Sequence, residues 1–325
     1  MSVVTNVSNV PLTLAVWAVN DKYDYVNDPT YYSVTSLLKP VRQIILQRRV
    51  DMNTVSTDVE DYLARAMGTS IHDSIEKAWV ENYKKNLAIL GVQDKVIEKF
   101  KINPKKEDLK EGDIPVYLEQ RNIKEFNGYK IGGKFDFVAD GLLHDNKSTT
   151  TMKWTKGSSD EDYKLQGSLY KWLNQDKITE DYIRINFVFT DWSKLSAMKD
   201  PSYPQHRAAY RDIKLLSLGE TEDWLSKKLN QISKYKDAPE ESLPECSDEE
   251  LWRTPTKYKY FSNPAATRAT KNFDSQMEAY KYMMTEKKGL GTIRVVPGEP
   301  RRCSYCSAAS ICSQCKRMLG DKNGS

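Results

Sequence analysis

Two short runs of strand-forming residues, joined by an Asp-Gly pair, constrain the fold of this chain more than any other feature. Residues 131–139 and 142–147 have the composition of β-strands, and Asp140 and Gly141 lie between them. Asp-Gly pairs favour the tight turns that connect antiparallel strands. The two runs therefore predict a β-hairpin over residues 132–147.

The polar residues of this hairpin occupy positions that bring them together. Side chains two positions apart in a strand share a face, so Asp145 and Lys147 point the same way. Asp136 points away from its neighbours Phe135 and Phe137, which can pack into a core. Pairing of the two strands then places Asp136 near Asp145, with Lys147 beside them.

Two carboxylates and a lysine on one rim fit the metal-assisted hydrolysis of a phosphodiester. Carboxylate oxygens bind a hard divalent cation. Such a cation polarises the scissile phosphate and lowers the pKa of bound water. Lys147 can orient the attacking water and offset the charge that builds on phosphorus. The pattern D-x-K is common by itself, and a solvent-facing charged hairpin is the alternative interpretation.

The segments around the hairpin predict an α/β or α+β core, with helices flanking a central mixed sheet. Residues 182–189 alternate apolar side chains as a strand does, and residues 1–30 are typical of an irregular or strand-rich lead-in. A helix is expected at residues 36–49, with Pro40 in its first turn. A capping box of Thr57 and Glu60 opens another helix, which is interrupted at Gly68 and resumes at residues 71–79. Further helices are expected at residues 162–173, 224–232 and 273–288, the last of which ends before Gly289.

The composition suits a soluble protein with a sizeable core. Of the 325 residues, 39% are hydrophobic and 29% are charged, which allows one large domain or two modest ones. No stretch approaches the ~20 apolar residues that span a bilayer. The apolar run at residues 12–19 lacks a basic segment before it and does not resemble a signal peptide. We therefore expect no membrane association and a reducing cytoplasm.

One segment concentrates positive charge, although the net charge of the chain is only +4. Residues 253–273 contain no Asp or Glu but several Lys and Arg, interleaved with aromatic residues. Lys257 and Lys259 can contact phosphates, and Tyr260 can stack on bases, as in grooves that bind nucleic acid strands. The alternative is a solvated strand that buries one aromatic face.

The cysteines indicate a second kind of metal site. Four of the five cysteines fall within thirteen positions, at Cys303, Cys306, Cys312 and Cys315. In a cytosolic chain such clustering indicates metal binding rather than disulfides. Close thiolates bind soft metals, either zinc or an iron–sulfur cluster. Free structural thiols are the alternative, which four cysteines this close disfavour.

Several groups of residues carry a resemblance to RecB-type PD-(D/E)xK nucleases, in the order and at the separations of that family. Residues 133–137 (Gly-Lys-Phe-Asp-Phe) and 145–149 (Asp-Asn-Lys-Ser-Thr) resemble motifs II and III. Residues 68–72 resemble the helical G-x-x-x-H motif, and residues 166–170 resemble Q-x-x-x-Y. Residues 33–38 look like the segment that opens such domains. The resemblance implies a restriction-endonuclease-like core over about residues 33–190.

The resemblance assigns roles to individual residues of the core. It implies that Asp136, Asp145 and His72 are ligands of Mg²⁺ or Mn²⁺ and that Lys147 is the catalytic lysine. The histidine is typical of exonuclease-type members, whereas a lone helical histidine would be a structural residue. Glu119, on a strand before the hairpin, matches a frequent glutamate of the family and is a further candidate acid.

A helical pair after the hairpin completes the candidate site. Gln166 and Tyr170 lie four positions apart and therefore share one face of a helix. The resemblance implies that they contact DNA or support the site. A purely structural hydrogen bond between them is the alternative.

The cysteine spacing also resembles iron–sulfur members of the family, among them CRISPR-associated and phage exonucleases. Lys39-Pro40 stands where a Cys-Pro pair is common in that family, and Cys315 is additional. Cys315 opens an alternative, as the fourth ligand of a local zinc site. In either form we expect the metal to be structural. The resemblance implies a [4Fe–4S] cluster on Cys246, Cys303, Cys306 and Cys312.

The chain is thus expected to have a lead-in at residues 1–32, a nuclease core at 33–240, a C-terminal segment with the basic stretch and cysteine cluster at 241–320, and a tail at 321–325. We expect a metal-dependent deoxyribonuclease, an exonuclease acting in DNA recombination, repair or phage DNA processing in a bacterium or a phage-infected cell. No P-loop of the G-x-x-x-x-G-K-[ST] type is present, so a separate helicase, recombinase or annealing protein is the expected partner. The alternatives are a catalytically silent DNA-binding or assembly protein with the same fold, and a zinc-stabilised interaction module.

Overall fold

The computed structural model describes residues 3–21, 24–157 and 159–320, which form two compact units. The first unit contains the chain up to Leu38 and Met52–Asn230, and the second contains Lys39–Asp51 and the chain from Gln231 onward. Residues 39–51, expected in the nuclease core, thus cluster with the C-terminal stretch. The expected tail at residues 321–325 lies outside the described residues, as do residues 1–2 and 22–23 of the lead-in.

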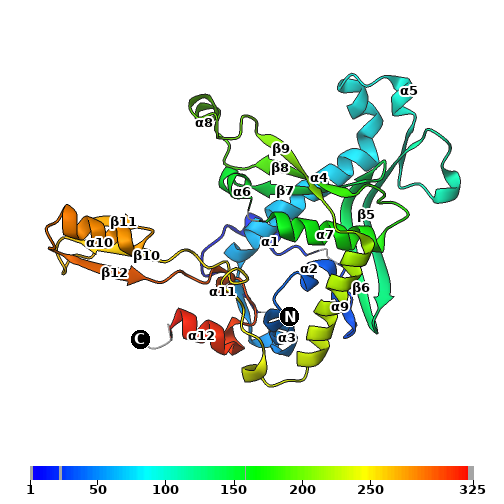
Figure 1. Ribbon diagram of the computed structural model, residues 1–325. Coiled ribbons are helices and arrows are strands. Elements are labelled where there is room, and N and C mark those ends of the chain that lie inside the picture. The colour runs from blue at the N-terminus through cyan, green and yellow to red at the C-terminus, as the bar shows by residue number, and fades with distance from the viewer. Residues whose placement is uncertain (1–2, 22–23, 158, 321–325) are drawn as a thin grey trace. The chain divides into compact units, whose positions relative to one another are not determined.

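A seven-stranded mixed sheet forms the centre of the first unit (Figure 1). Its strands are β2 (Tyr31–Ser33), β4 (Phe100–Ile102), β5 (Ile114–Phe126), β6 (Tyr129–Ala139), β7 (Leu142–Thr149), β8 (Tyr182–Phe189) and β9 (Ala208–Lys214). They are ordered β4-β5-β6-β7-β8-β9, and β2 pairs with β6. The pairs β2–β6, β4–β5 and β7–β8 are parallel, and the other pairs are antiparallel.

Helices flank this sheet, as the sequence predicts (Figure 1). They are α1 (Leu12–Ala18), α2 (Val34–Leu37), α4 (Val59–Ile89), α5 (Asp94–Ile97), α6 (Thr151–Lys156), α7 (Asp160–Leu173), α8 (Lys194–Lys199) and α9 (Leu218–Tyr235), with 3-10 turns at Met52–Thr54 and Lys106–Asp108. Helix α4 contacts β7, whereas α7 contacts β5, β6, β8 and β9. A short parallel pair, β1 (Val3–Thr5) and β3 (Ser56–Asp58), precedes α4. No helix in the described ranges is both long and apolar enough to cross a membrane.

The central strands bury the residues that their sequence pattern selects. In β8, Ile183, Ile185 and Phe189 are fully buried, which confirms the strand predicted at residues 182–189. In β6, Phe135 and Phe137 are buried as predicted. Removal of such side chains from water is the main favourable contribution to the stability of the unit.

The second unit is built from shorter elements. They are α3 (Val41–Arg49), the last turn of α9, α10 (Gln276–Thr285), α11 (Arg301–Ser304), α12 (Ser313–Leu319), and 3-10 turns at Glu240–Ser242 and Ala309–Ile311. Its strands are β10 (Lys257–Phe261), β11 (Lys271–Phe273) and β12 (Thr292–Val296). These strands form an antiparallel sheet in the order β11-β10-β12.

Three predicted helix boundaries are wrong for identifiable reasons. The helix expected at residues 36–49 is divided into α2 and α3, because Pro40 disfavours helical geometry in the residue before it. Asp58 caps α4 in place of Thr57, with its side chain accepting a hydrogen bond from the N–H two residues later. Gly68 does not interrupt α4, because one glycine costs only about 1 kcal/mol in a helix interior.

Two further differences follow from pairing and packing. The lead-in contains the helix α1, whose Ala15 and Ala18 pack with Val59 of α4. The helix expected at residues 273–288 begins later, because Phe273 belongs to β11 and pairs with Tyr258. Local periodicity predicted the helix but not the competing strand.

Candidate functional site

The strands of the hairpin separate where its polar residues lie. β6 has β5 along one edge, while β2 pairs with residues 130–132 and β7 with residues 137–139 on the other edge. Among the described residues, 133–136 therefore have no strand partner on that second edge. Asp136 lies in this gap, and Asp145 follows the last residue of β7 that pairs with β6. From there β7 remains paired with β8 alone.

Asp136 is held in the gap by α4 and by the backbone of β7. Its Oδ2 lies 3.1 Å from Nδ1 of His72 and accepts a hydrogen bond of 3.4 Å from the N–H of Asn146. Burial alone would raise the pKa of Asp136, but the bond from His72 and the charges of His72 and Lys147 lower it below its usual value. The same hydrogen bond raises the pKa of His72. Asp136 is therefore a carboxylate anion at neutral pH.

Glu119 lies opposite Asp136 in an unusual backbone conformation. Its φ is 50°, in the left-handed region that residues with a side chain rarely occupy. β5 pairs with β6 through the residues on both sides of Glu119 but not through Glu119 itself. One ligand atom each from Glu119, Asp136 and His72 lies within 4.8 Å of the others. Backbone strain of this kind concentrates at functional sites.

The environment of Glu119 raises its pKa above the usual value. Burial raises the pKa of Glu119, and the charge of Asp136 acts in the same direction, whereas an ion pair with Lys134 opposes both. A bound cation would oppose them further. The carboxylate is thus placed where positive charge stabilises it.

Asp145 and Lys147 form an ion pair on β7. Asp145 is 2% exposed, and its Oδ2 lies 2.6 Å from Nζ of Lys147. Within the described residues that oxygen accepts no hydrogen bond of good geometry. Burial raises the pKa of Asp145. Burial would lower the pKa of Lys147, but the carboxylates of Asp145 and Asp136 raise it, so the lysine is charged.

The structure brings together all five residues that were predicted as catalytic: His72, Glu119, Asp136, Asp145 and Lys147. Three carboxylates and an imidazole are the oxygen and nitrogen ligands that Mg²⁺ or Mn²⁺ accepts. The buried carboxylate of Asp145, paired with Lys147, is a position that further positive charge would stabilise. The arrangement therefore fits a divalent metal ion with a lysine beside it.

Helix α7 supports this site from one side. Gln166 donates a hydrogen bond of 3.2 Å from Nε2 to Oη of Tyr170. Tyr170 is 5% exposed, and a Cβ added to Gly133 would lie 2.7 Å from its ring, so β6 and α7 approach closely here. Tyr163 was not predicted, although Nζ of Lys147 lies 5.9 Å from the centroid of its ring. Its place one turn before Gln166 on the same helix face could have identified it.

The basic segment of the second unit uses its aromatic residue differently from the prediction. Tyr260 is 1% exposed, and its hydroxyl donates to the carbonyl of Leu290 at 2.8 Å. The expectation that Tyr260 stacks on bases is therefore wrong for this conformation, because its ring packs inside the unit. Lys257 forms an ion pair with Asp274. Phosphate contact by Lys257 and Lys259 stays a prediction.

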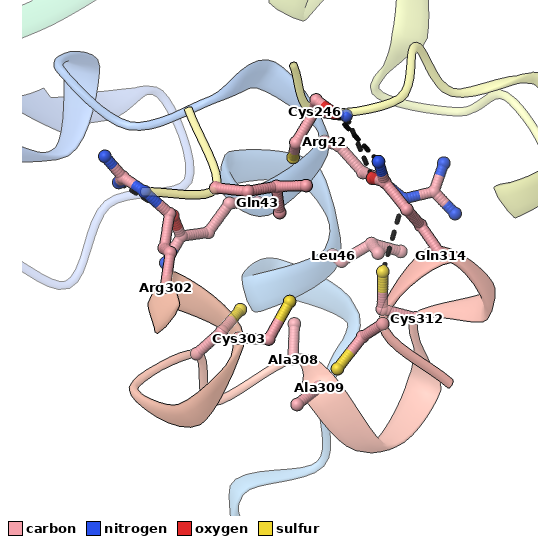
Figure 2. Close-up of a pocket in the computed structure, with 13 residues that line it drawn as sticks. Arg42, Gln43, Leu46, Cys246, Arg302, Cys303, Ala308, Ala309, Cys312 and Gln314 are labelled. Atoms are coloured by element: carbon pink, nitrogen blue, oxygen red, sulfur yellow. Dashed lines mark hydrogen bonds between the residues drawn. The ribbon is translucent and has the colours of Figure 1, made fainter. Parts of the chain in front are cut away.

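All five cysteines line one cavity of the second unit (Figure 2). Cys246 comes from a loop, Cys303 from α11, and Cys312 from the start of α12. Gln314 connects two of these segments, accepting from the N–H of Cys246 at 2.9 Å and donating to its carbonyl at 2.8 Å. Burial raises the pKa of Cys246 to about 12 and does the same for Cys315.

Arg42 lines the same cavity, and no sequence pattern had indicated a role for it. Its side chain is almost fully buried, and Nε–H donates to Sγ of Cys312 at 3.3 Å (Figure 2). It also donates to the carbonyl of Leu243 at 3.1 Å and forms an ion pair with Glu240. The available signal was an arginine in the first turn of α3, apart from the two arginines at its C-terminal end.

The cysteines do not form a group of three as compact as the candidate ligands of the first unit. In the part of the chain that the structure describes, His72, Glu119 and Asp136 are the one group of three metal-binding residues whose ligand atoms all lie within 4.8 Å of one another. No three cysteines meet that spacing. Tetrahedral zinc, with Zn–S bonds of about 2.3 Å, would bring its sulfurs to about 3.8 Å from one another.

Comparison with known proteins gives only distant likenesses. No family model and no curated protein matches the sequence. Solved structures that match include the crystal structure of SSO0001, at 14% identity and a TM-score of 0.42 over 70% of this chain and 87% of that chain. A phage-related exonuclease from Haemophilus somnus 129PT matches at 17% identity and a TM-score of 0.26, over 52% of this chain and 80% of that chain. At such TM-scores neither likeness carries an argument.

Proposed function

We propose that this chain is a metal-dependent deoxyribonuclease with a PD-(D/E)xK core. The observation that carries the proposal is the convergence of Asp136, Asp145 and Lys147 at the gap between the strands, with His72 and Glu119 beside them. Asp136, Asp145 and Lys147 come from one hairpin, whereas His72 comes from α4 and Glu119 from β5. Their meeting at one buried, strained position is more than a solvent-facing charged hairpin requires.

The proposed cofactor is Mg²⁺ or Mn²⁺. Asp136 and Asp145 would hold the ion through carboxylate oxygens, with Glu119 and His72 as further ligands. The burial of Asp145 favours this assignment, because a cation would add to the stabilisation that Lys147 gives its carboxylate. When bound, the ion supplies positive charge against the negative charge that develops on the phosphate.

The protein residues supply the remaining electrostatics. Lys147 is charged because two carboxylates raise its pKa, and its ammonium can donate hydrogen bonds to a phosphate oxygen or to water. Asp145 and the ring of Tyr163 restrict the position of that ammonium. His72 orients Asp136 through its Nδ1 contact. Each of these residues therefore either carries a charge at the site or positions a charged side chain there.

The finer assignment is an exonuclease of the RecB type that acts on DNA ends in recombination, repair or phage DNA processing. Its support is the order of the sequence groups that contain His72, Asp136, Asp145 and Gln166, together with the placement of their side chains around one site. A separate helicase, recombinase or annealing protein would act with it, in the cytoplasm of a bacterium or a phage-infected cell.

For the second unit we propose a structural [4Fe–4S] cluster on four cysteines of the cavity: Cys246, Cys303, Cys306 and Cys312. Its support is the convergence of the cysteines on one cavity, together with the resemblance of the spacing of Cys303, Cys306 and Cys312 to that of iron–sulfur members of the family. Zinc with Cys315 as a ligand is the alternative.

The test is degradation of end-labelled linear DNA, single- and double-stranded, with added Mg²⁺ or Mn²⁺. We expect the native chain to cut and Lys147→Ala to lose cleavage, since its charge acts on the transition state. Lys214→Ala, which removes an exposed lysine from β9 of the same sheet, is the matched control and should cut normally. If native protein binds DNA and cuts none of it under any condition, the nuclease proposal fails and the silent DNA-binding protein replaces it.

A further inference from the structure

The three-stranded sheet of the second unit has α10 on one of its faces. Tyr260 of β10 and Phe273 of β11 contact Tyr282 of α10, with ring centroids 5.2 Å and 5.1 Å apart. Side chains alternate between the two faces along a strand. The residues between these aromatic positions therefore lie on the opposite face of the sheet.

That opposite face carries a row of polar residues across the three strands. Lys259 of β10 pairs with Asn272 of β11 on one side and with Arg294 of β12 on the other. Paired residues of neighbouring strands share a face, so the three side chains lie side by side. Asn272 and Arg294 are exposed, and Lys259 is partly exposed. We call these three residues the cationic row.

The row places two positive charges directly opposite each other. Like charges at paired positions destabilise a sheet. In the described part of the chain, neither Lys259 nor Arg294 takes part in an ion pair, whereas Lys257, two residues away, pairs with Asp274. Arg294 instead covers the ring of Phe261, with its guanidinium carbon 4.3 Å from the ring centroid. Its guanidinium also donates a hydrogen bond to the carbonyl of Pro264. Among the described residues no carboxylate pairs with either cation, and an anionic ligand would do so.

We propose that the cationic row of the second unit binds the phosphate backbone of DNA. The choice of DNA as the polyanion rests on the proposed function. The row consists of two cations and an amide, and the rings of Tyr260 and Phe273 are packed against α10. Contact is therefore with phosphates rather than bases, without preference for sequence, and duplex and single-stranded DNA are both bound.

The test is the affinity of the full chain for a labelled duplex, measured by fluorescence anisotropy over a series of salt concentrations without added divalent cations. The variant is Lys259→Gln with Arg294→Gln. Each phosphate contact contributes about 0.9 to the slope of log K against log salt, so the variant should reduce the slope by about 1.8 and the affinity at ~0.1 M salt by at least about 10-fold. Thermal unfolding should occur at an equal or higher temperature than in the native chain, because the like-charge pair is removed.

The matched control is Lys281→Gln with Lys287→Gln, which removes two charges from α10 and its following turn. The proposal is overturned if the row variant binds as tightly as the native chain, or if the control pair weakens binding equally. It is also overturned if polyglutamate displaces the DNA at equal charge concentration, since the row would then recognise an acidic protein segment.

Cleavage by the same proteins with added Mn²⁺ separates this proposal from the nuclease proposal. If the native chain cleaves DNA and the row variant binds DNA as tightly as the native chain, only the cationic-row proposal is overturned. If binding depends on the row but the native chain cleaves no DNA, only the nuclease proposal is overturned. Each result therefore decides one of the two questions.

Discussion

The two candidate metal sites of this protein are built in opposite ways. The site of the first unit takes its candidate ligands from helix α4 and from strands β5, β6 and β7. Residues from position 72 to position 145 of the chain therefore meet at the central sheet. The cysteine cavity of the second unit takes four of its five thiols from thirteen consecutive positions, in short helices and turns. The first is polar and strained, with a buried carboxylate paired with a lysine. The second combines sulfur with both apolar and polar side chains and is tied to α3 by Arg42.

The difference indicates which site depends on its metal for structure. Strand pairing holds the ligands of the first site whether or not a cation is present. The segments around the cysteines have few long elements, so a bound metal would contribute directly to their folding. We therefore expect changes in the first site to alter chemistry with little effect on stability, and changes in the second site to alter stability first.

The largest expected effect is on DNA cleavage. Asp145→Asn keeps the shape of the side chain and removes the charge that a cation needs. We expect the cleavage rate to fall at least about 1,000-fold, which corresponds to about 4 kcal/mol of transition-state stabilisation. The initial rate on end-labelled DNA measures this, alongside thermal unfolding by circular dichroism.

Asp140→Asn is the matched control for that variant. It makes the same substitution in the turn of the same hairpin, where a φ of 48° suits asparagine. It should cut as the native chain does. Equal activity of the two variants would contradict the assignment of Asp145 as a metal ligand.

The second effect concerns the metal content of the cysteine cavity. Replacing Cys303 by serine should remove bound iron and lower the unfolding temperature of the second unit, because the ligand and its folding contribution are lost together. Cys315→Ser should keep the iron, since Cys315 is the fifth cysteine and serves as a hydrogen-bond partner of Cys303. Iron, acid-labile sulfide and zinc per chain are measured after anaerobic purification. Zinc that is lost with Cys315→Ser would establish the alternative site.

A third, smaller effect tests the contribution of Arg42 to the same cavity. Arg42→Met removes a buried charge from the ion pair with Glu240 and from its contact with Cys312, and should lower the free energy of unfolding by about 3–5 kcal/mol. Arg49→Met, on the exposed end of the same helix, should cost about 1 kcal/mol. Denaturant unfolding followed by circular dichroism compares them. Equal losses would show that burial of Arg42 has no special importance.

The smallest effect concerns the partner of Asp136. His72→Gln removes the imidazole that lies 3.1 Å from that carboxylate, so the concentration of Mn²⁺ needed for half-maximal cleavage should rise about 10-fold. His206→Gln, at an exposed position, should leave it unchanged. A rate that falls without any change in the metal requirement would instead make His72 a contact of the DNA.

Much of the first site follows from local sequence patterns. Alternation along β7 placed Asp145 and Lys147 together, and the Asp-Gly turn brought Asp136 to the same end of the hairpin. These predictions succeed because strand periodicity and turn chemistry act over a few residues. The left-handed backbone of Glu119 has no such signal, since nothing in its neighbours indicates a positive φ.

The second unit departs further from local patterns. Tyr260 occurs among lysines, yet it packs against α10, because burial of a large ring outweighs the polarity of its neighbours. Arg42 occurs in a helix with two further arginines, yet it is buried by partners about 200 and 270 residues later in the sequence. Such contacts depend on which distant segments meet, which periodicity does not encode.

The sequence by itself determined which candidate ligands this protein carries: acids, a histidine and a lysine that would suit a hard metal ion, and clustered cysteines that would suit a soft one. It also determined the main strands and helices around the acids. Only the tertiary structure decided that the strands part at Asp136, that Glu119 and His72 reach the same gap, and that Lys259 stands opposite Arg294. The physical reason is that side-chain chemistry and strand alternation are local properties, whereas strand pairing and burial are settled by the free energy of the whole fold.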